Sequence, residues 1–155
     1  MQKDWHFKDD TSICLFRTVG VLIRNKKILV QCDHDVYALP GGHVKVGESS
    51  EQSLIREYKE ETGADILCDR LIWTEETFWE WGSIKTHGII FYYLISLRND
   101  NEIPDNCFLS QKDNCNIELM WVTFDEMESL EIYPSFIKEK IKSINDGIEH
   151  IISYE

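Results

Sequence analysis

Three glutamates crowd one short stretch of this chain, Glu57, Glu60 and Glu61, directly after Arg56. Like charges three or four residues apart on a helix repel each other by roughly 0.2–0.5 kcal/mol per pair, and a single arginine offsets only part of three negative charges. Clustered oxygen ligands suit a hard cation such as Mg²⁺ or Mn²⁺. The stretch therefore predicts a metal-binding helix. The alternative is a solvated acidic face with an Arg56–Glu60 ion pair.

The position of these carboxylates on the predicted helix bears on the choice. With about 100° of rotation per residue, Leu54 and Tyr58 share one helical face, which should point into the core. Glu57 and Glu61 fall on the edge of that face rather than on the solvated side. Partly buried carboxylates must be paired or must coordinate a metal, so this placement favours the metal site.

The segment before the helix could bring backbone to the same ligand. Gly41 and Gly42 follow a proline, and glycine lets the backbone approach a ligand closely, so a carbonyl of this turn could join the coordination. Ser49 with Gln52 fits a capping box, and Gly63 stands where a left-handed residue ends a helix. The sequence predicts a helix that begins at about residue 50, ends before Gly63 and presents free N–H groups to anions at its N-terminus.

The rest of the chain alternates β-rich segments with polar turns. Strands are predicted over 11–25, 28–32, 66–80, 85–98 and 119–124. Loops are predicted over 33–47, where Pro and Gly exclude regular structure, and over 99–116. A helical turn over 125–130 and an amphipathic helix over 134–148 complete the chain. We expect one domain over residues 1–155, built on a mixed sheet flanked by helices.

Composition argues against several classes of protein. The formal net charge of −12 repels phosphate polymers, so a nucleic-acid polymer is not an expected partner. No run approaches the roughly 20 apolar residues that span a bilayer, and the N-terminus lacks the apolar core of a signal peptide. The five cysteines form no CxxC pair. We expect a cytoplasmic protein without membrane contact, and the aromatics at 78–81 and the apolar C-terminal segment IISYE are compatible with a homodimer.

The glycines and charged residues around the helix follow a known spacing. Gly42, five residues, Glu48, seven residues, and then the run from Arg56 to Ala64 resemble the Nudix box, and every fixed Gly, Glu and Arg position is matched. The sequence departs from the box only at two packing positions, Tyr58 and Ala64. The resemblance implies an α/β/α sandwich with a mixed β-sheet. It also implies Mg²⁺- or Mn²⁺-dependent hydrolysis of a diphosphate linkage, usually in a nucleoside diphosphate derivative.

The resemblance also implies roles for individual residues. The metal-binding positions fall on Gly41 (through its carbonyl), Glu57, Glu60 and Glu61. Arg56 would orient a glutamate, and Glu48 would anchor the loop against the helix. We expect Glu57 to be the general base, because Arg56 can hold it in place. Glu118, just before the strand over 119–124, and Asp113 are alternatives, although either could be an ordinary surface charge.

Several side chains outside the helix are candidates for substrate contact: Tyr37, His43, Phe78, Trp79, Trp81 and His87. An aromatic ring could stack on a base, but strand aromatics more often pack a core, and a lone histidine is more often structural. The proline expected about fifteen residues past the box in ADP-ribose hydrolases is absent, as is the downstream motif of the NADH-cleaving group. We therefore expect a nucleoside triphosphate or a small nucleotide-like substrate. The alternative function is a nucleotide-sensing domain without turnover.

Overall fold

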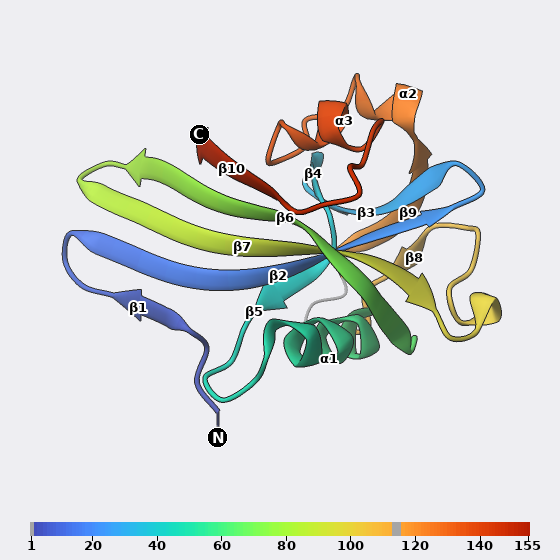
Figure 1. Cartoon of the computed structure of the whole chain (residues 1–155), viewed down its shortest axis with the longest axis horizontal. Helices are drawn as coiled ribbons and strands as arrows, with labels where there is room; N and C mark the ends of the chain where they lie inside the picture. Colours follow the sequence, from blue (N-terminus) through green and yellow to red (C-terminus); the bar gives the residue numbers. More distant parts are fainter. Residues whose placement is uncertain (1, 113–115) are drawn as a thin grey trace.

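A mixed β-sheet forms the centre of the molecule (Figure 1). The computed structural model describes residues 2–112 and 116–155. In chain order the elements are β1 (His6–Lys8), β2 (Ser12–Arg24), β3 (Lys27–Asp33), β4 (Val36–Ala38), β5 (Gly41–His43), α1 (Ser50–Thr62), β6 (Ile66–Trp81), β7 (Ile84–Leu97), the 3-10 helix η1 (Asp100–Glu102), β8 (Phe108–Leu109), β9 (Glu118–Thr123), α2 (Phe124–Met127), α3 (Ile137–Lys140) and β10 (Glu149–Tyr154). The strand order is β10–β6–β7–β2–β3–β9–β8, with β1 and β5 paired to β2 and β4 paired to β3.

The direction of the strands makes the sheet mixed, as predicted. β2 runs parallel to β7 and β10 runs parallel to β6, whereas β6 and β7 form a long antiparallel hairpin. Figure 1 shows α1 on one side of the sheet and α2 and α3 on the other. The predicted α/β/α arrangement is therefore confirmed. None of the helices in the described part of the chain has the length and apolarity needed to cross a membrane.

Two apolar clusters, one on each face of the sheet, hold the layers together. Successive side chains of a strand point to opposite faces, and along β2 Val21 belongs to one cluster and Leu22 to the other. Leu54 and Tyr58 of α1 are fully buried in the Leu22 cluster, whereas Ile137 of α3 lies in the Val21 cluster. The apolar face predicted for α1 is therefore the face that packs on the sheet.

Helix α1 begins and ends where the sequence predicts. The Ser49 side chain accepts a hydrogen bond from the Gln52 backbone N–H at 3.1 Å, and the Gln52 side chain accepts one from the Ser49 N–H at 2.9 Å. Gly63 follows the helix with a φ of 77°, in the left-handed region that favours glycine. These caps confirm the predicted helix boundaries.

Tyr58, one of the two departures from the box, packs its ring against a glycine of β2. A Cβ atom on Gly20 would lie 2.7 Å from Cε2 of Tyr58, which is too close for any side chain. The Tyr58 hydroxyl donates to the Gly20 carbonyl at 3.4 Å. Because β2 carries a glycine where α1 comes closest, the large Tyr58 side chain fits without moving α1 away from the sheet.

The prediction for the C-terminal segment was largely wrong. The helix expected over 134–148 is limited to α3, and residues 141–148 form turns, bends and irregular chain. The strand β10 begins just beyond the predicted helix and pairs with β6. Half-buried and exposed side chains alternate along β10, which is the period of a strand rather than of a helix. The segment IISYE therefore uses its backbone to extend the sheet of its own chain.

The two predicted loops also contain short strands. The Pro-Gly turn was expected to be irregular, but β5 pairs antiparallel with β2, with Gly41 opposite Val19. A Cβ atom on Gly41 would lie 2.1 Å from the Thr18 carbonyl oxygen, so glycine is what allows this close pairing. The loop over 99–116 carries η1 and β8, and β1 was not predicted. Hydrogen bonds to a distant strand, which local propensity does not reveal, create the short strands among these elements.

Candidate active site

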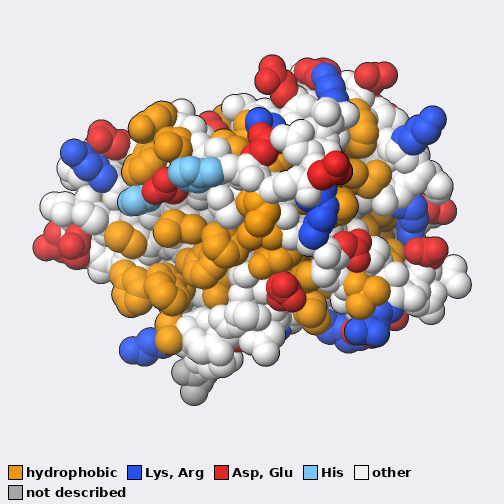
Figure 2. Space-filling view, viewed as in Figure 1, with side chains coloured by type: hydrophobic (Ala, Val, Ile, Leu, Met, Phe, Trp, Pro, Cys, Tyr) orange, Lys and Arg blue, Asp and Glu red, His pale blue; other side chains and the backbone are white. Residues whose placement is uncertain are grey.

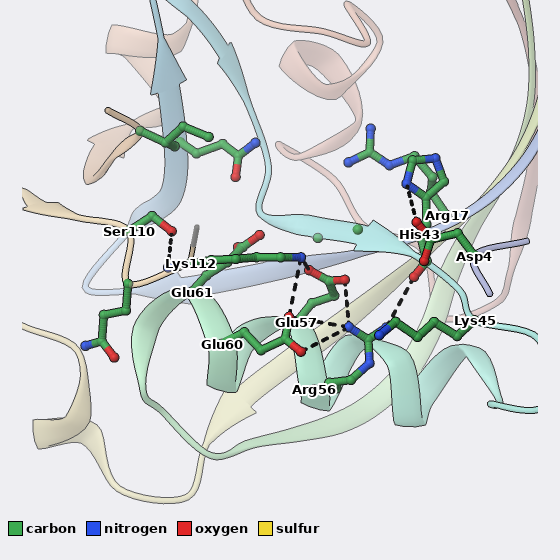
Figure 3. A pocket seen from close by; sticks show the side chains of 15 residues that line it. Asp4, Arg17, His43, Lys45, Arg56, Glu57, Glu60, Glu61, Ser110 and Lys112 are labelled. Carbon is green, nitrogen blue, oxygen red and sulfur yellow. Dashed lines mark hydrogen bonds and ion pairs between the residues drawn. The ribbon is translucent and has the colours of Figure 1, made fainter. Parts of the chain in front are cut away.

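The residues of the predicted box gather around a cavity of about 780 Å³ between β5, α1 and the segment after β8 (Figure 3). Of the residues singled out in the sequence, Gly41, Gly42, His43, Arg56, Glu57, Glu60 and Glu61 line it. It is also lined by Asp4, Arg17, Gln31, Lys45, Ser110, Gln111, Lys112 and Ile117, for which the sequence suggested no role.

Glu57 is the most buried of the three glutamates, with 3% of its surface exposed. Its carboxylate lies between two cations, as Figure 3 shows. Nη1 of Arg56 donates to Oε1 at 2.9 Å, and Nζ of Lys112 donates to Oε2 at 2.6 Å. A Cβ atom on Gly42 would lie 2.3 Å from Cδ of Glu57. Glycine at this position of β5 therefore makes room for the carboxylate.

Arg56 ties the loop before α1 to the helix. Its Nε and Nη2 atoms donate to the two carboxylate oxygens of Glu48 at 2.9 and 3.1 Å, and Nη2 also donates to the His43 carbonyl at 3.3 Å. The Ser53 hydroxyl donates to the same carboxylate. The hydrogen bond from Arg56 lowers the pKa of Glu48. Although burial opposes its charge, the hydrogen bonds to Glu48 and Glu57 raise the pKa of Arg56.

Glu61 and Glu60 differ in their surroundings. Glu61 is buried, and its Oε2 atom has no hydrogen-bond partner among the described residues. Burial, together with the nearby charge of Glu57, raises the pKa of Glu61 to about 8. The Glu60 side chain is 37% exposed and lies 3.4 Å from both Arg56 and Lys112. A buried carboxylate oxygen without a partner, facing two further carboxylates, is a donor set that a hard cation satisfies.

The ammonium group of Lys112 occupies the position between Glu57 and Glu60 at which a bound cation would be expected. Among the residues described, no three metal-ligating side chains converge on one point; instead Nζ of Lys112 lies 2.6 Å from Glu57 and 3.4 Å from Glu60. An ammonium group and a metal cation satisfy the same carboxylates. The residues present therefore fit a divalent cation in charge and ligand type, with Lys112 as its competitor.

Of the six predicted substrate contacts, only His43 lines this cavity, and Tyr37, Phe78 and His87 line neither this cavity nor the second one described below. Phe78 of β6 and His87 of β7 are paired across the hairpin and stack on each other, with ring centroids 4.3 Å apart. Figure 2 shows one face of the molecule, where hydrophobic side chains gather over β1, β2 and β7. Tyr37 packs against the Val21 cluster. Alternation along the strand explains the placement of Phe78, because its neighbours point to the opposite face.

Neither alternative base lines the cavity in the described residues. Glu118 is exposed at the start of β9, where it pairs with Cys32 of β3, and the cavity is lined by its neighbour Ile117 instead. Asp113 lies outside the described residues. Of the candidate bases, Glu57 alone among those described is in the cavity.

A second cavity, of about 470 Å³, shares Arg17 with the first. Trp79 and Trp81 line it, as do Ala38, Glu75, Thr77, Glu80, Ile90, Tyr133, Pro134 and Glu155. The sequence contained one signal for Arg17, a charged residue inside an otherwise apolar β-rich run. It contained none for Lys112, which stands in a polar segment remote from the box in sequence.

The NUDIX domain matches residues 15–142. The human m7GpppN-mRNA hydrolase NUDT17 is 26% identical over 113 residues, which are 68% of this chain and 34% of that protein. The chain thus spans about a third of the length of this curated relative.

Two solved bacterial structures illustrate the similarity of fold. The MutT protein of Bacillus halodurans has a TM-score of 0.66 at 19% identity, covering 90% of both chains. An ADP-ribose pyrophosphatase of Streptococcus suis has a TM-score of 0.53 at 17% identity, covering 89% of this chain and 98% of that one. At these identities the likeness shows the fold alone.

Proposed function

This chain belongs to the Nudix hydrolase family, and from that premise we propose that it hydrolyses a diphosphate linkage in a small nucleotide-type molecule. The observation that carries the proposal is the cavity lined by Glu57, Glu60 and Glu61, in which a buried oxygen of Glu61 has no partner among the described residues. We assign this activity to a single domain over residues 1–155.

The three glutamates and the Gly41 carbonyl are the groups that would hold Mg²⁺ or Mn²⁺. When bound, such a cation neutralises phosphate charge and lowers the pKa of bound water. Glu57 takes the proton from the attacking water, because Arg56 fixes its carboxylate with a 2.9 Å hydrogen bond. The water oxygen bonds to phosphorus, the bond from phosphorus to the bridging oxygen breaks, and that oxygen leaves with the second phosphate.

Other box residues support this arrangement without contacting substrate. Glu48 accepts two hydrogen bonds from Arg56 and so holds the guanidinium against Glu57. Gly42 leaves space for the Glu57 carboxylate, and Gly63 ends the helix that carries the glutamates. These contacts keep the carboxylates in place before any ligand binds.

Hydrolysis of a substrate panel tests the proposal. The panel covers nucleoside triphosphates (oxidised ones included), nucleotide sugars, ADP-ribose, dinucleoside polyphosphates and a methylated cap dinucleotide, each with Mg²⁺, with Mn²⁺ and with chelator. Glu61→Gln is the inactive variant, and Glu51→Gln, an exposed glutamate of the same helix, is its matched control. We expect metal-dependent turnover of one class that Glu61→Gln loses and Glu51→Gln keeps. Tight binding of one compound without turnover would instead identify a nucleotide-sensing domain.

A further inference from the structure

We propose that Arg17 binds a phosphate of the substrate at the junction of the two cavities, and that the second cavity holds the aromatic group of the same molecule. The substrate class is then a nucleotide whose phosphates reach the glutamates while its uncharged or cationic base lies between Trp79 and Tyr133. This inference rests on the proposed function for the first cavity.

The register of four strands places Arg17 at this junction. Glu75 of β6 pairs with Ile90 of β7, Ile90 pairs with Arg17 of β2, and Arg17 pairs with His43 of β5. Directly paired residues project from the same face of a sheet. His43 lines the first cavity, Glu75 lines the second, and Arg17, between them in the row, lines both.

Arg17 carries a positive charge that acts on Glu61 and His43 through space but forms no ion pair with a described residue. Its Nε atom is buried and has no hydrogen-bond partner, and no ion pair joins its guanidinium to another described residue. In a chain with a net charge of −12, and beside a cavity with three glutamates, an unpaired arginine is conspicuous. Its positive charge still acts on the first cavity, because it helps to lower the pKa of His43, where burial is the larger cause. A phosphate accepts two hydrogen bonds from a guanidinium in a planar, bidentate geometry.

The walls of the second cavity decide what it can take. Trp79, Ile90, Tyr133 and Pro134 supply aromatic and apolar surface, on which a planar ring stacks. Its volume of about 470 Å³ lies within the range of small-molecule pockets. The cavity therefore fits a group of nucleoside size.

Carboxylates in the same walls exclude a further anion. Glu75, Glu80 and Glu155 line the second cavity, and Glu75 is fixed by hydrogen bonds from the Tyr92 hydroxyl, at 2.8 Å, and from the Ser153 hydroxyl. Like charges at close range are costly where water is excluded. The group beyond Arg17 is therefore a hydrogen-bond donor or a cation, not a second phosphate.

Binding measurements separate the two halves of this inference. Calorimetry with Mg²⁺ uses three kinds of probe: inorganic tripolyphosphate, the nucleosides adenosine and guanosine, and ATP and GTP analogues with methylene groups at both bridging positions. Arg17→Gln should weaken the binding of tripolyphosphate and of at least one nucleotide analogue by about 10- to 100-fold, which is what a hydrogen bond to a charged group contributes to affinity. Its affinity for the nucleosides should be unchanged. Trp79→Ala should do the reverse, weakening nucleoside and analogue but not tripolyphosphate.

Two further variants guard this test. Arg98→Gln removes the same charge from an exposed position and should leave all affinities unchanged; an equal loss in Arg98→Gln would reduce the effect of Arg17 to general electrostatics and overturn the inference. Arg17→Lys keeps the charge without the planar fork and should recover part of the affinity even if Arg17→Gln folds poorly.

The outcomes also distinguish this inference from the proposed function. If the protein hydrolyses a panel substrate but Arg17→Gln binds tripolyphosphate and the analogues with unchanged affinity, the role of Arg17 is refuted and the proposed hydrolase function is retained. If the analogues bind through Arg17 and Trp79 but no panel substrate is hydrolysed, the proposed hydrolase function is refuted and the binding roles of Arg17 and Trp79 are retained. If the wild-type protein binds none of the probes, the nucleotide class is wrong.

Discussion

Replacing Gly42 with alanine should displace the Glu57 carboxylate, because the two groups compete for one space. The added Cβ atom would lie 2.3 Å from Cδ and 2.5 Å from each carboxylate oxygen of Glu57. These atoms are the end of a flexible side chain, so the carboxylate can swing away while the backbone stays. It would then lose its hydrogen bonds to Arg56 and Lys112, which measure 2.9 and 2.6 Å.

The expected cost follows from this geometry. Overpacking a buried site costs about 1–3 kcal/mol, and we expect Gly42→Ala to lower the free energy of unfolding by an amount in that range. Misplacing a catalytic group by about 1 Å can cost about 100-fold in rate, so kcat/KM should fall by about that factor. Urea unfolding without metal and the hydrolysis assay measure the two effects separately.

A double-mutant cycle with Glu57→Ala isolates the cause. Without the Glu57 carboxylate, Gly42→Ala should cost almost nothing, so the coupling energy should equal nearly the whole cost of the single mutant. Gly147→Ala is the matched control, because a Cβ atom there meets nothing within 4 Å. Gly41→Ala is a second comparison, since its Cβ atom would strike the Thr18 carbonyl oxygen at 2.1 Å and Glu57→Ala cannot relieve that contact. An undiminished cost of Gly42→Ala in the Glu57→Ala background would refute the reasoning.

Three further predictions concern charges around the site. Lys112→Gln removes the ammonium group that donates to Glu57. Without metal it should lower the free energy of unfolding by about 1–2 kcal/mol. It should also tighten Mn²⁺ binding measured by calorimetry, and weaker Mn²⁺ binding would contradict the assigned competition between Lys112 and the metal. Glu48→Gln weakens the paired hydrogen bonds from Arg56 and should cost about 1–3 kcal/mol in thermal or urea unfolding. Burial raises the pKa of Glu75 above its ordinary 4.5, so above that pH the folded protein keeps a proton that the unfolded chain releases. The contribution of Glu75 to the free energy of unfolding should therefore fall as pH rises above about 4.5. A Glu75→Gln variant whose free energy of unfolding has the same slope with pH would exclude this group as the source.

The sequence predicted α1 well because the signals for it are local. The capping box at Ser49, the left-handed Gly63 and the apolar period of Leu54 and Tyr58 all lie within the helix or next to it. The same period predicted that Glu57 would be buried. Where the determinants of structure are a few residues apart, propensity and pattern agree.

The strand and the site residues that the sequence did not predict depend on distant partners. β10 is a strand because β6 offers its edge, and an apolar segment of that length is compatible with either a strand or a helix until its neighbour is known. Arg17 joins the site through the pairing of β2 with β5, and Lys112 joins it through a side chain that crosses to α1. None of these contacts leaves a pattern within its own segment.

Three of the cations that line the first cavity differ in how firmly the protein holds them, and this difference suggests their roles. Arg56 is anchored by Glu48 and by the His43 carbonyl as well as by Glu57, so it stays when a ligand arrives. The Lys112 ammonium group contacts only Glu57 and Glu60 among the described residues, and its side chain is 33% exposed, so a divalent cation that binds those carboxylates can displace it into solvent. The Arg17 guanidinium has no ion-pair partner in the described part of the chain, so its charge is free to meet a phosphate. One fixed cation, one displaceable cation and one cation without an ion-pair partner among the described residues allow an acidic cavity to be stable when empty and still attract an anionic substrate.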